Sequence, residues 1–349
     1  MKKQSDKPFL ASLWLLSSIY LIMILMLVFA SISYLFKTPH GRPGMISKTS
    51  GQVTLDWLHG GENTITINSE NGEKESHQVL LEDHAYSDNN TARQGQTKDP
   101  IIVEDGETIR KGARLTMNEL SGFDAIYSSI HSPEIRYSTS ISLITCTISA
   151  LLSLWVAIPT GYLLSRFDFP GKNLIDAILD IPIVLPPLVV GICLLALFNL
   201  PPFSLISEWV VFEIPAIILA QFMVACAFAV RTMRVTFDRI PERYEKVALT
   251  LGCKRSKAFY SVALPQARYG IITAFTLAWA RSLGEFGPVL VFAGSTSFRT
   301  EVLPTSVFLE LQAGNLKGTL VISLLMIIIA TIVLIFARIF GMNREGLEQ

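Results

Sequence analysis

Five long runs of this sequence contain no Asp, Glu, Lys or Arg: residues 8–36, 137–165, 181–207, 214–230 and 319–337. A helix needs roughly 20 largely apolar residues to cross the hydrocarbon core of a bilayer. Half of the 349 residues are hydrophobic and only 17% are charged, a composition too apolar for an ordinary soluble protein. The formal net charge is zero, so no basic excess points to nucleic acid. The sequence predicts an integral membrane protein.

A sixth membrane span is predicted from Ile271 to Phe292, which is apolar except for Arg281 and Glu285. These two side chains are four residues apart, so we expect them to share one helix face and to pair, which lowers the cost of placing charge in a membrane. An intramembrane ion pair is a candidate functional site. A purely structural pair that holds the span against its neighbours is an equal alternative.

The distribution of Lys and Arg predicts the orientation, because short cytoplasmic loops hold the excess of basic residues. Segment 231–268 is rich in them, whereas segments 199–213 and 293–318 hold only Arg299 and Lys317. Both termini are therefore expected in the cytoplasm, with the chain crossing the plasma or inner membrane several times. The first run is interpreted as a retained anchor, because the apolar region of a cleaved signal is about 7 to 15 residues long.

Residues 37–133 differ in kind from the rest of the chain and are interpreted as an extracytoplasmic insertion between the first two spans. Apolar stretches flank the turn pairs Asn71-Gly72 and Asp105-Gly106, which suit hairpins because these residues tolerate positive φ. A small β-rich domain is expected, with a mobile loop over 83–100. All five histidines (His40, His59, His77, His84 and His131) lie here, but their spacings match no compact ligand pattern, so we expect no metal site.

The segment 231–268, named here the coupling loop, has a helix–break–helix pattern. Pro241 suits the first turn of a helix, and an apolar stripe follows at i, i+3, i+4 and i+7. Its members are Tyr244, Val247, Ala248 and Leu251. Gly252 is expected to end this helix, Ser256 to cap a second one, and Pro265 to end that. The loop is either an amphipathic hairpin on lipid headgroups or a docking element for a cytosolic partner.

At these residues the chain resembles the permease subunits of ABC importers, whose loop reads Glu-Ala-Ala, three residues, Gly, nine residues, then Ile, one residue, Leu-Pro. The match is carried by Lys246-Val247-Ala248, Gly252, Val262 and Leu264-Pro265, with Lys246 and Val247 replacing the usual Glu and Ala. The resemblance implies that this loop docks a cytosolic ATPase. The residues assigned to docking are Tyr244, Glu245, Lys246, Val247, Ala248, Leu251, Gly252, Leu264 and Pro265.

Further motifs are similar to the molybdate, tungstate and sulfate branch of these permeases. Residues 279–294 read Trp-Ala-Arg-Ser-Leu-Gly-Glu-Phe-Gly-Pro-Val-Leu-Val-Phe-Ala-Gly. Residues 300–305 and 311–316 look more like the molybdate and tungstate members than the sulfate ones. The resemblance extends from about Ser132 to the last span, and leaves out the first span and the insertion.

The resemblance implies the fold of type I ABC importer permeases, and together with the predicted spans this gives an all-α membrane protein with six transmembrane helices, which also carries the β-rich insertion that lies outside the resemblance. The expected segments are residues 1–36, 37–133, a permease core at 134–340, and a cytoplasmic tail at 341–349. It further implies a homodimer, two cytosolic ABC ATPase subunits and an extracytoplasmic oxyanion-binding protein. ATP and magnesium would be used by the ATPase, since this chain has no phosphate-binding G-x-x-x-x-G-K-[ST] loop and is expected to bind no cofactor itself.

The expected function is import of an oxyanion, molybdate or tungstate, by alternating access. Prolines interrupt the third run and glycines accompany the ion pair, and bends of this kind occur near transport paths, although kinked packing alone is the simpler alternative. The path candidates are Pro186, Pro187, Arg281, Glu285 and Gly287. The alternatives are a sulfate or thiosulfate permease of the same family and, from another class, a membrane-anchored sensor with the insertion as receptor.

Overall fold

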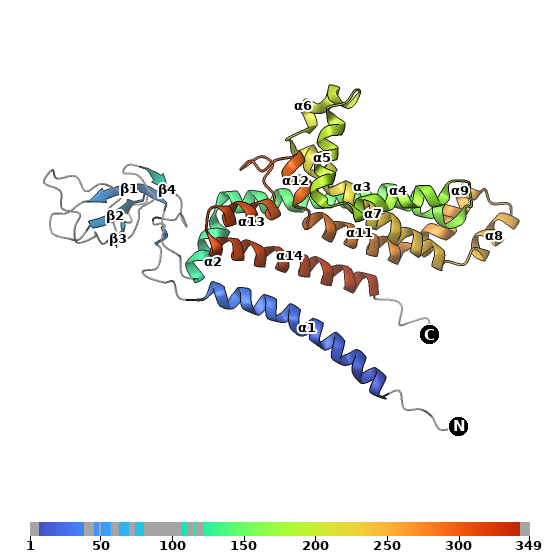
Figure 1. Ribbon diagram of the computed structural model, residues 1–349, viewed down its shortest axis with the longest axis horizontal. Coiled ribbons are helices and arrows are strands. Elements are labelled where there is room, and N and C mark those ends of the chain that lie inside the picture. The colour runs from blue at the N-terminus through green and yellow to red at the C-terminus, as the bar shows by residue number, and fades with distance from the viewer. Residues whose placement is uncertain are drawn as a thin grey trace. The chain divides into compact units, whose positions relative to one another are not determined.

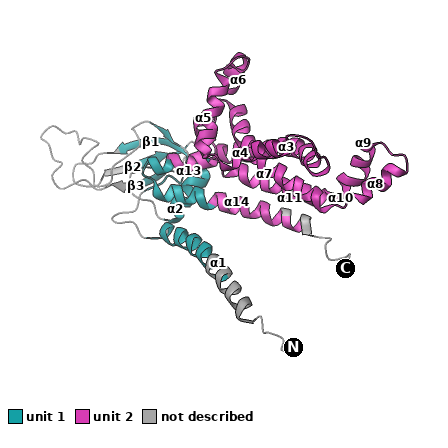
Figure 2. Cartoon of the chain, turned by 45° about the vertical axis from the view of Figure 1, so that its right-hand side comes forward, with its two compact units in different colours: residues 1–135, 310–324 teal, residues 136–309, 325–349 magenta. Residues whose placement is uncertain are grey.

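The computed structural model describes residues 7–37, 45–48, 50–56, 63–69, 74–79, 107–109, 115 and 122–342 (Figure 1). The expectations for the loop at 83–100, for His40, His59 and His84, and for the tail after residue 342 lie outside these residues. The chain divides into two compact units (Figure 2). One comprises residues 1–135 and 310–324, and the other residues 136–309 and 325–349.

The first unit contains a four-stranded antiparallel sheet in the order β3-β2-β1-β4. Its strands are β1 (Gly51–Asp56), β2 (Asn63–Asn68), β3 (Lys74–Val79) and β4 (Thr108–Ile109). Val53, Ile65 and Ile67 alternate along their strands and are buried together with Ile109 and Leu115. The predicted small β domain is thus present, and β2 and β3 form the hairpin expected around Asn71-Gly72.

Helix α1 (Lys7–Leu35), α2 (Gly122–His131) and the first turns of α14 (Leu316–Met342) also belong to the first unit. Leu35 of α1, Ala125 of α2 and Val321 of α14 are buried in one cluster with Ile46. The Lys317 ammonium donates to the carbonyl of Lys37 over 3.2 Å. The C-terminal end of α1 is therefore packed inside this unit.

The second unit is helical. Its elements are most of α3 (Pro133–Arg166), α4 (Lys172–Val184), α5 (Pro187–Phe198), the 3₁₀ turn η1 (Phe203–Ile206), α6 (Ser207–Val210), α7 (Ile214–Arg239), α8 (Arg243–Thr250), α9 (Arg255–Ala258), the π-helical turn η2 (Phe259–Ala263), α10 (Leu264–Gln266), α11 (Arg268–Leu283), α12 (Gly287–Phe292), most of α13 (Leu303–Gln312) and the rest of α14.

Helix α7 is the centre of the second unit, with α11 and α4 packed against it (Figure 1). One core cluster is rich in alanine, including Ala225 and Ala229 of α7 and Ala274 and Ala278 of α11. Small side chains let membrane helices approach closely. A second cluster joins α5 to α12.

Three helices among the described residues are long and apolar enough to cross a membrane: Pro133–Arg166, Ile214–Arg239 and Leu316–Phe336. They match three of the predicted spans. Within α1, the segment Ile22–Leu35 is an apolar helix shorter than these three, so the span predicted over 8–36 stays a prediction. The other two predicted spans are broken, as described below, and six continuous spans are not confirmed.

Candidate coupling loop and translocation path

The coupling loop folds as the sequence predicts in outline, with differences at its boundaries. Helix α7 continues to Arg239, and α8 then runs from Arg243 to Thr250. Gly252 follows with φ of 84°, a left-handed conformation that glycine adopts without steric cost. Lys254, not Ser256, precedes α9, and Pro265 does not end the second helix. It lies in the first turn of α10, where its missing N–H is tolerated.

Three members of the predicted apolar stripe on α8 are exposed. Tyr244 is 43% exposed, Val247 57% and Leu251 79%. Ala248 is half-buried, as is Leu264, whereas Pro265 is exposed. Three neighbouring apolar side chains without cover on one short helix are a surface suited to a partner.

The charged residues of α8 face two different environments. Lys246 is exposed and its ammonium pairs with Glu242 over 2.8 Å, a contact that lowers the pKa of the Glu242 carboxyl. Glu245 is buried instead. Its carboxylate accepts hydrogen bonds from Tyr162 Oη at 2.5 Å and Arg166 Nε at 2.8 Å, both near the end of α3. Glu245 therefore fastens α8 to α3 and does not belong to the exposed surface.

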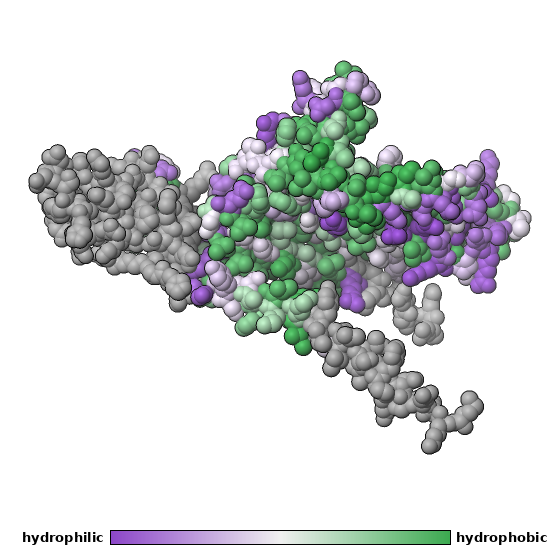
Figure 3. Space-filling view, viewed as in Figure 1, coloured by the Kyte–Doolittle hydropathy of each residue, from purple (hydrophilic) through white to green (hydrophobic). Residues whose placement is uncertain are grey.

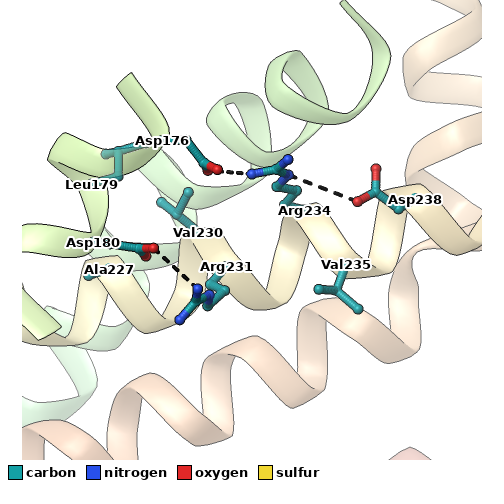
Figure 4. Close-up of a pocket in the computed structure, with 9 residues that line it drawn as sticks. All are labelled: Asp176, Leu179, Asp180, Ala227, Val230, Arg231, Arg234, Val235 and Asp238. Carbon is teal, nitrogen blue, oxygen red and sulfur yellow. Dashed lines mark hydrogen bonds and ion pairs between the residues drawn. The ribbon is translucent and has the colours of Figure 1, made fainter. Parts of the chain in front are cut away.

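A set of ion pairs that the sequence analysis did not single out joins α4 to α7. Asp176 accepts from Arg234 and Asp180 from Arg231, and Asp238 lies 4.0 Å from Arg234 (Figure 4). They line a cavity of about 270 Å³. The sequence signal for this set was the i, i+4 spacing of Asp176 and Asp180 before an apolar run. Nothing in the sequence indicated their arginine partners on α7.

The span predicted over 181–207 is not one continuous helix: it comprises the end of α4, all of α5 and the turn η1, and α4 and α5 are bent by 111°. The break falls at Leu185, which is extended with ψ of 139°. A proline disfavours the helical conformation in the residue before it, so Pro186 and Pro187 together force this break. Pro187 then starts α5 in its first turn.

The span predicted over 271–292 is also broken, between α11 and α12. Arg281 and Glu285 form the expected ion pair at 3.0 Å, but they do not share one helix, because α11 ends at Leu283. The Glu285 side chain is 2% exposed and that of Arg281 32%. Among the residues that the structure describes, buried Glu285 Oε1 has no hydrogen-bond partner. The ion pair thus places the buried carboxylate of Glu285 between the end of α11 and the start of α12.

The two helix breaks meet. A β-carbon built on Gly287 would lie 3.1 Å from the backbone nitrogen of Leu188 and 3.3 Å from Pro187. Val190 and Leu194 of α5 are buried in the same cluster as Val289 of α12. The structure therefore brings the path candidates Pro187 and Gly287 into contact, and Gly287 follows Glu285 of the ion pair by two residues.

Hydrophobic side chains cover α5 and the outward face of α4, and hydrophilic ones gather at the end that carries α8 and α9 (Figure 3). Within the described part of the chain no group of three or more His, Cys, Asp or Glu is arranged to hold a metal ion. Of the histidines in that part, His77 pairs with Glu75 over 2.8 Å, and His131 Nδ1 lies 2.9 Å from the carbonyl oxygen of Tyr127.

Residues 157–343 match the family model described as the binding-protein-dependent transport system inner membrane component. The molybdate/tungstate transport system permease protein of Pyrococcus abyssi is 39% identical over 171 residues, which cover 49% of this chain and 66% of that protein. The sulfate transport system permease protein of Escherichia coli is 30% identical over 215 residues, which cover 60% of this chain and 76% of that protein.

A crystal structure of a bacterial ABC transporter involved in the import of the acidic polysaccharide alginate contains a chain of similar fold. The TM-score is 0.53 at 16% identity, covering 63% of this chain and 83% of that one. The resemblance to the oxyanion branch of ABC importer permeases is confirmed by these comparisons. Because the family model covers more than half of its residues, the chain belongs to the inner-membrane components of binding-protein-dependent transport systems, the multi-pass permeases of ABC importers.

Proposed function

We propose that this chain is the translocating subunit of an importer for molybdate or tungstate. The observation that carries the choice of cargo is the 39% identity to a molybdate/tungstate permease, against 30% to a sulfate permease. Sulfate is the second candidate, because the sulfate permease is still 30% identical over 60% of this chain. The three anions share charge and tetrahedral shape, so the chemistry required of the path is the same.

The exposed stripe of Tyr244, Val247 and Leu251 is the proposed docking surface for a cytosolic ATPase. Exposed apolar side chains on a short helix gain free energy when a partner groove covers them. The Lys246 ammonium pairs with Glu242, so its charge does not lie within the stripe. ATP and magnesium are used by that partner, and this chain binds neither.

The meeting point of the two helix breaks is the proposed part of the path where the anion passes. Broken helices in transporters lie where backbone groups line a cavity. Arg281 supplies a positive charge that is one-third exposed, and Glu285 neutralises it when no anion is present. Pro187 and Gly287 allow the two backbones to approach one another.

The proposed assembly contains two copies of this chain, two ATPase subunits and an extracytoplasmic binding protein, with both termini of the chain in the cytoplasm. Selectivity resides mainly in the binding protein. A sensor with the insertion as receptor is the competing interpretation, and it requires no ATPase.

The test is uptake of radiolabelled molybdate by proteoliposomes that contain the complex purified from the native membrane, with ATP inside and the binding protein outside. ATP-dependent uptake blocked by tungstate and not by sulfate is the expected result. Inhibition by sulfate at equal concentration would move the assignment to the sulfate permease. ATP-independent binding without uptake would support the sensor.

A further inference from the structure

Helix α4 contacts the rest of its unit through few partly buried apolar side chains and through two ion pairs. None of its thirteen residues is buried, and Leu174, Ile178 and Val184 are all exposed. Leu179 packs partly against the alanine-rich core. Two ion pairs attach the helix to α7, Asp176 with Arg234 and Asp180 with Arg231. An element held in this way can be re-seated when its charged partners move, since little apolar packing would have to be broken.

One partner of α4, Arg234, belongs to a series of polar contacts that begins on α8. Arg166 donates through Nε to Glu245 at 2.8 Å and through Nη1 to Ser165 at 3.3 Å. Ser165 donates to Asp238 at 2.6 Å. Asp238 lies 4.0 Å from Arg234, an electrostatic contact without a hydrogen bond, and Arg234 donates to Asp176.

The start of this chain is rigid. The side chains of Glu245 and Arg166 are 9% and 8% exposed, and Arg166 Nη2 also donates to the carbonyl of Ile240 at 2.8 Å. Ile240 directly follows Arg239, the last residue of α7. One arginine therefore connects the first turn of α8 to the ends of α3 and α7.

We propose that Glu245 and Arg166 are positioning residues that carry movement of α8, through Ser165, Asp238 and Arg234, to α4 and the helix break that follows it. This inference rests on the proposed function, because it assigns the route by which ATP hydrolysis at the docked partner reaches the path. Networks of buried and partly buried polar contacts with two arrangements are physical carriers of such coupling.

The test compares ATP hydrolysed with molybdate imported in the reconstituted complex. Glu245→Gln keeps the size of the side chain and removes its charge. We expect ATP hydrolysis to persist while uptake falls about tenfold, within the range usual for coupling between sites, so that the ATP cost per anion rises. A purely structural role would lower both rates together and leave the ratio unchanged, which would overturn the proposal.

The matched control is Asp168→Asn. Asp168 forms an ion pair with Lys172 beside this network, but its side chain is 98% exposed, and among the described residues no hydrogen bond or ion pair links it to α8. In this variant the ratio of ATP hydrolysed to molybdate imported should equal that of the wild type. Tyr162→Phe removes a single hydrogen bond to Glu245 and keeps the ion pair, so it gives a smaller rise in the ratio even if Glu245→Gln fails to assemble.

A double-mutant cycle tests the far end of the chain. Asp176→Asn should raise the ratio, and combining it with Glu245→Gln should add little, because both break one route. Multiplicative effects would show two independent defects and contradict the relay. Hydrogen exchange of residues 172–184 should respond to nucleotide in the wild type and not in either variant. If the wild type itself shows no ATP-driven uptake, the proposed function fails; if it is active with unchanged ratios in the variants, the relay alone fails.

Discussion

Gly191 of α5 lies directly against Pro288 of α12, since a β-carbon on Gly191 would be 2.8 Å from the Cα of Pro288 and 3.0 Å from its carbonyl oxygen. Both neighbours are backbone atoms, which cannot turn away as a flexible side chain does. The packing of the two half-helices at their breaks therefore requires a residue without a side chain at this position.

We expect Gly191→Ala to lower stability by about 1 to 3 kcal/mol, as overpacking of a filled core does. The measurement is the thermal unfolding midpoint of the purified protein in detergent. Gly284→Ala is the matched control, because Gly284 is in the second break with its nearest neighbours at 3.9 and 4.0 Å. Equal midpoints for the two variants would contradict the close contact.

The ion pair at the second break should respond unequally to loss of its two members. Arg281→Gln leaves a buried carboxylate unpaired, which typically costs about 3 to 5 kcal/mol. Glu285→Gln leaves an arginine that is one-third exposed, so its loss of stability should be smaller. The double variant should be more stable than Arg281→Gln alone, by the same unfolding assay. Additive losses would mean that the two charges do not depend on each other.

The sequence predicted contacts between residues that are close along the chain better than contacts between distant residues. Three predictions that depend on residues close together in the sequence are confirmed: Gly252 ends α8, Arg281 pairs with Glu285, and β2 and β3 form a hairpin. Prolines indicated that the third run was interrupted, but a bend of 111° depends on the helices packed around it.

The burial of Glu245 was not predicted, because its partners Arg166 and Tyr162 are 79 and 83 residues away along the chain. The stripe on α8 showed only that Glu245 lies on another face. The same applies to Arg234, whose contact with Asp176 crosses 58 residues. A single sequence carries no signal for which distant charges meet, and these are the contacts on which the relay depends.

The exposed stripe of α8 leads to a prediction about ATPase binding. Val247→Asp places a charge in the middle of the proposed docking surface, which should abolish co-purification of the ATPase from native membranes while the protein is inserted normally. Lys257→Gln is the control, since it alters an exposed charge of the same loop that lies on α9, outside the stripe. An ATPase that remains bound to Val247→Asp would exclude this stripe as the docking surface.

The break after α8 depends on the backbone of Gly252, which has φ of 84°, and a β-carbon added there would meet no heavy atom within 4 Å. Alanine therefore meets no clash, so its cost comes from the left-handed conformation alone, about 1 kcal/mol or slightly more. Because part of this cost is recovered if α8 extends by a turn, Gly252→Ala should re-aim Leu251 and weaken ATPase binding about fivefold, measured as the Kd of the purified partners.

Two further variants distinguish a change in the conformation of the coupling loop from a general loss of stability. Gly252→Asn should bind the ATPase almost normally, since asparagine tolerates the left-handed conformation. Gly171→Ala is the matched control, because Gly171 has φ of 90° and equally open surroundings but precedes α4. It should therefore bind the ATPase with the affinity of the wild type. Equal losses of affinity in the two alanine variants would assign the effect to general instability and not to the direction in which Leu251 points.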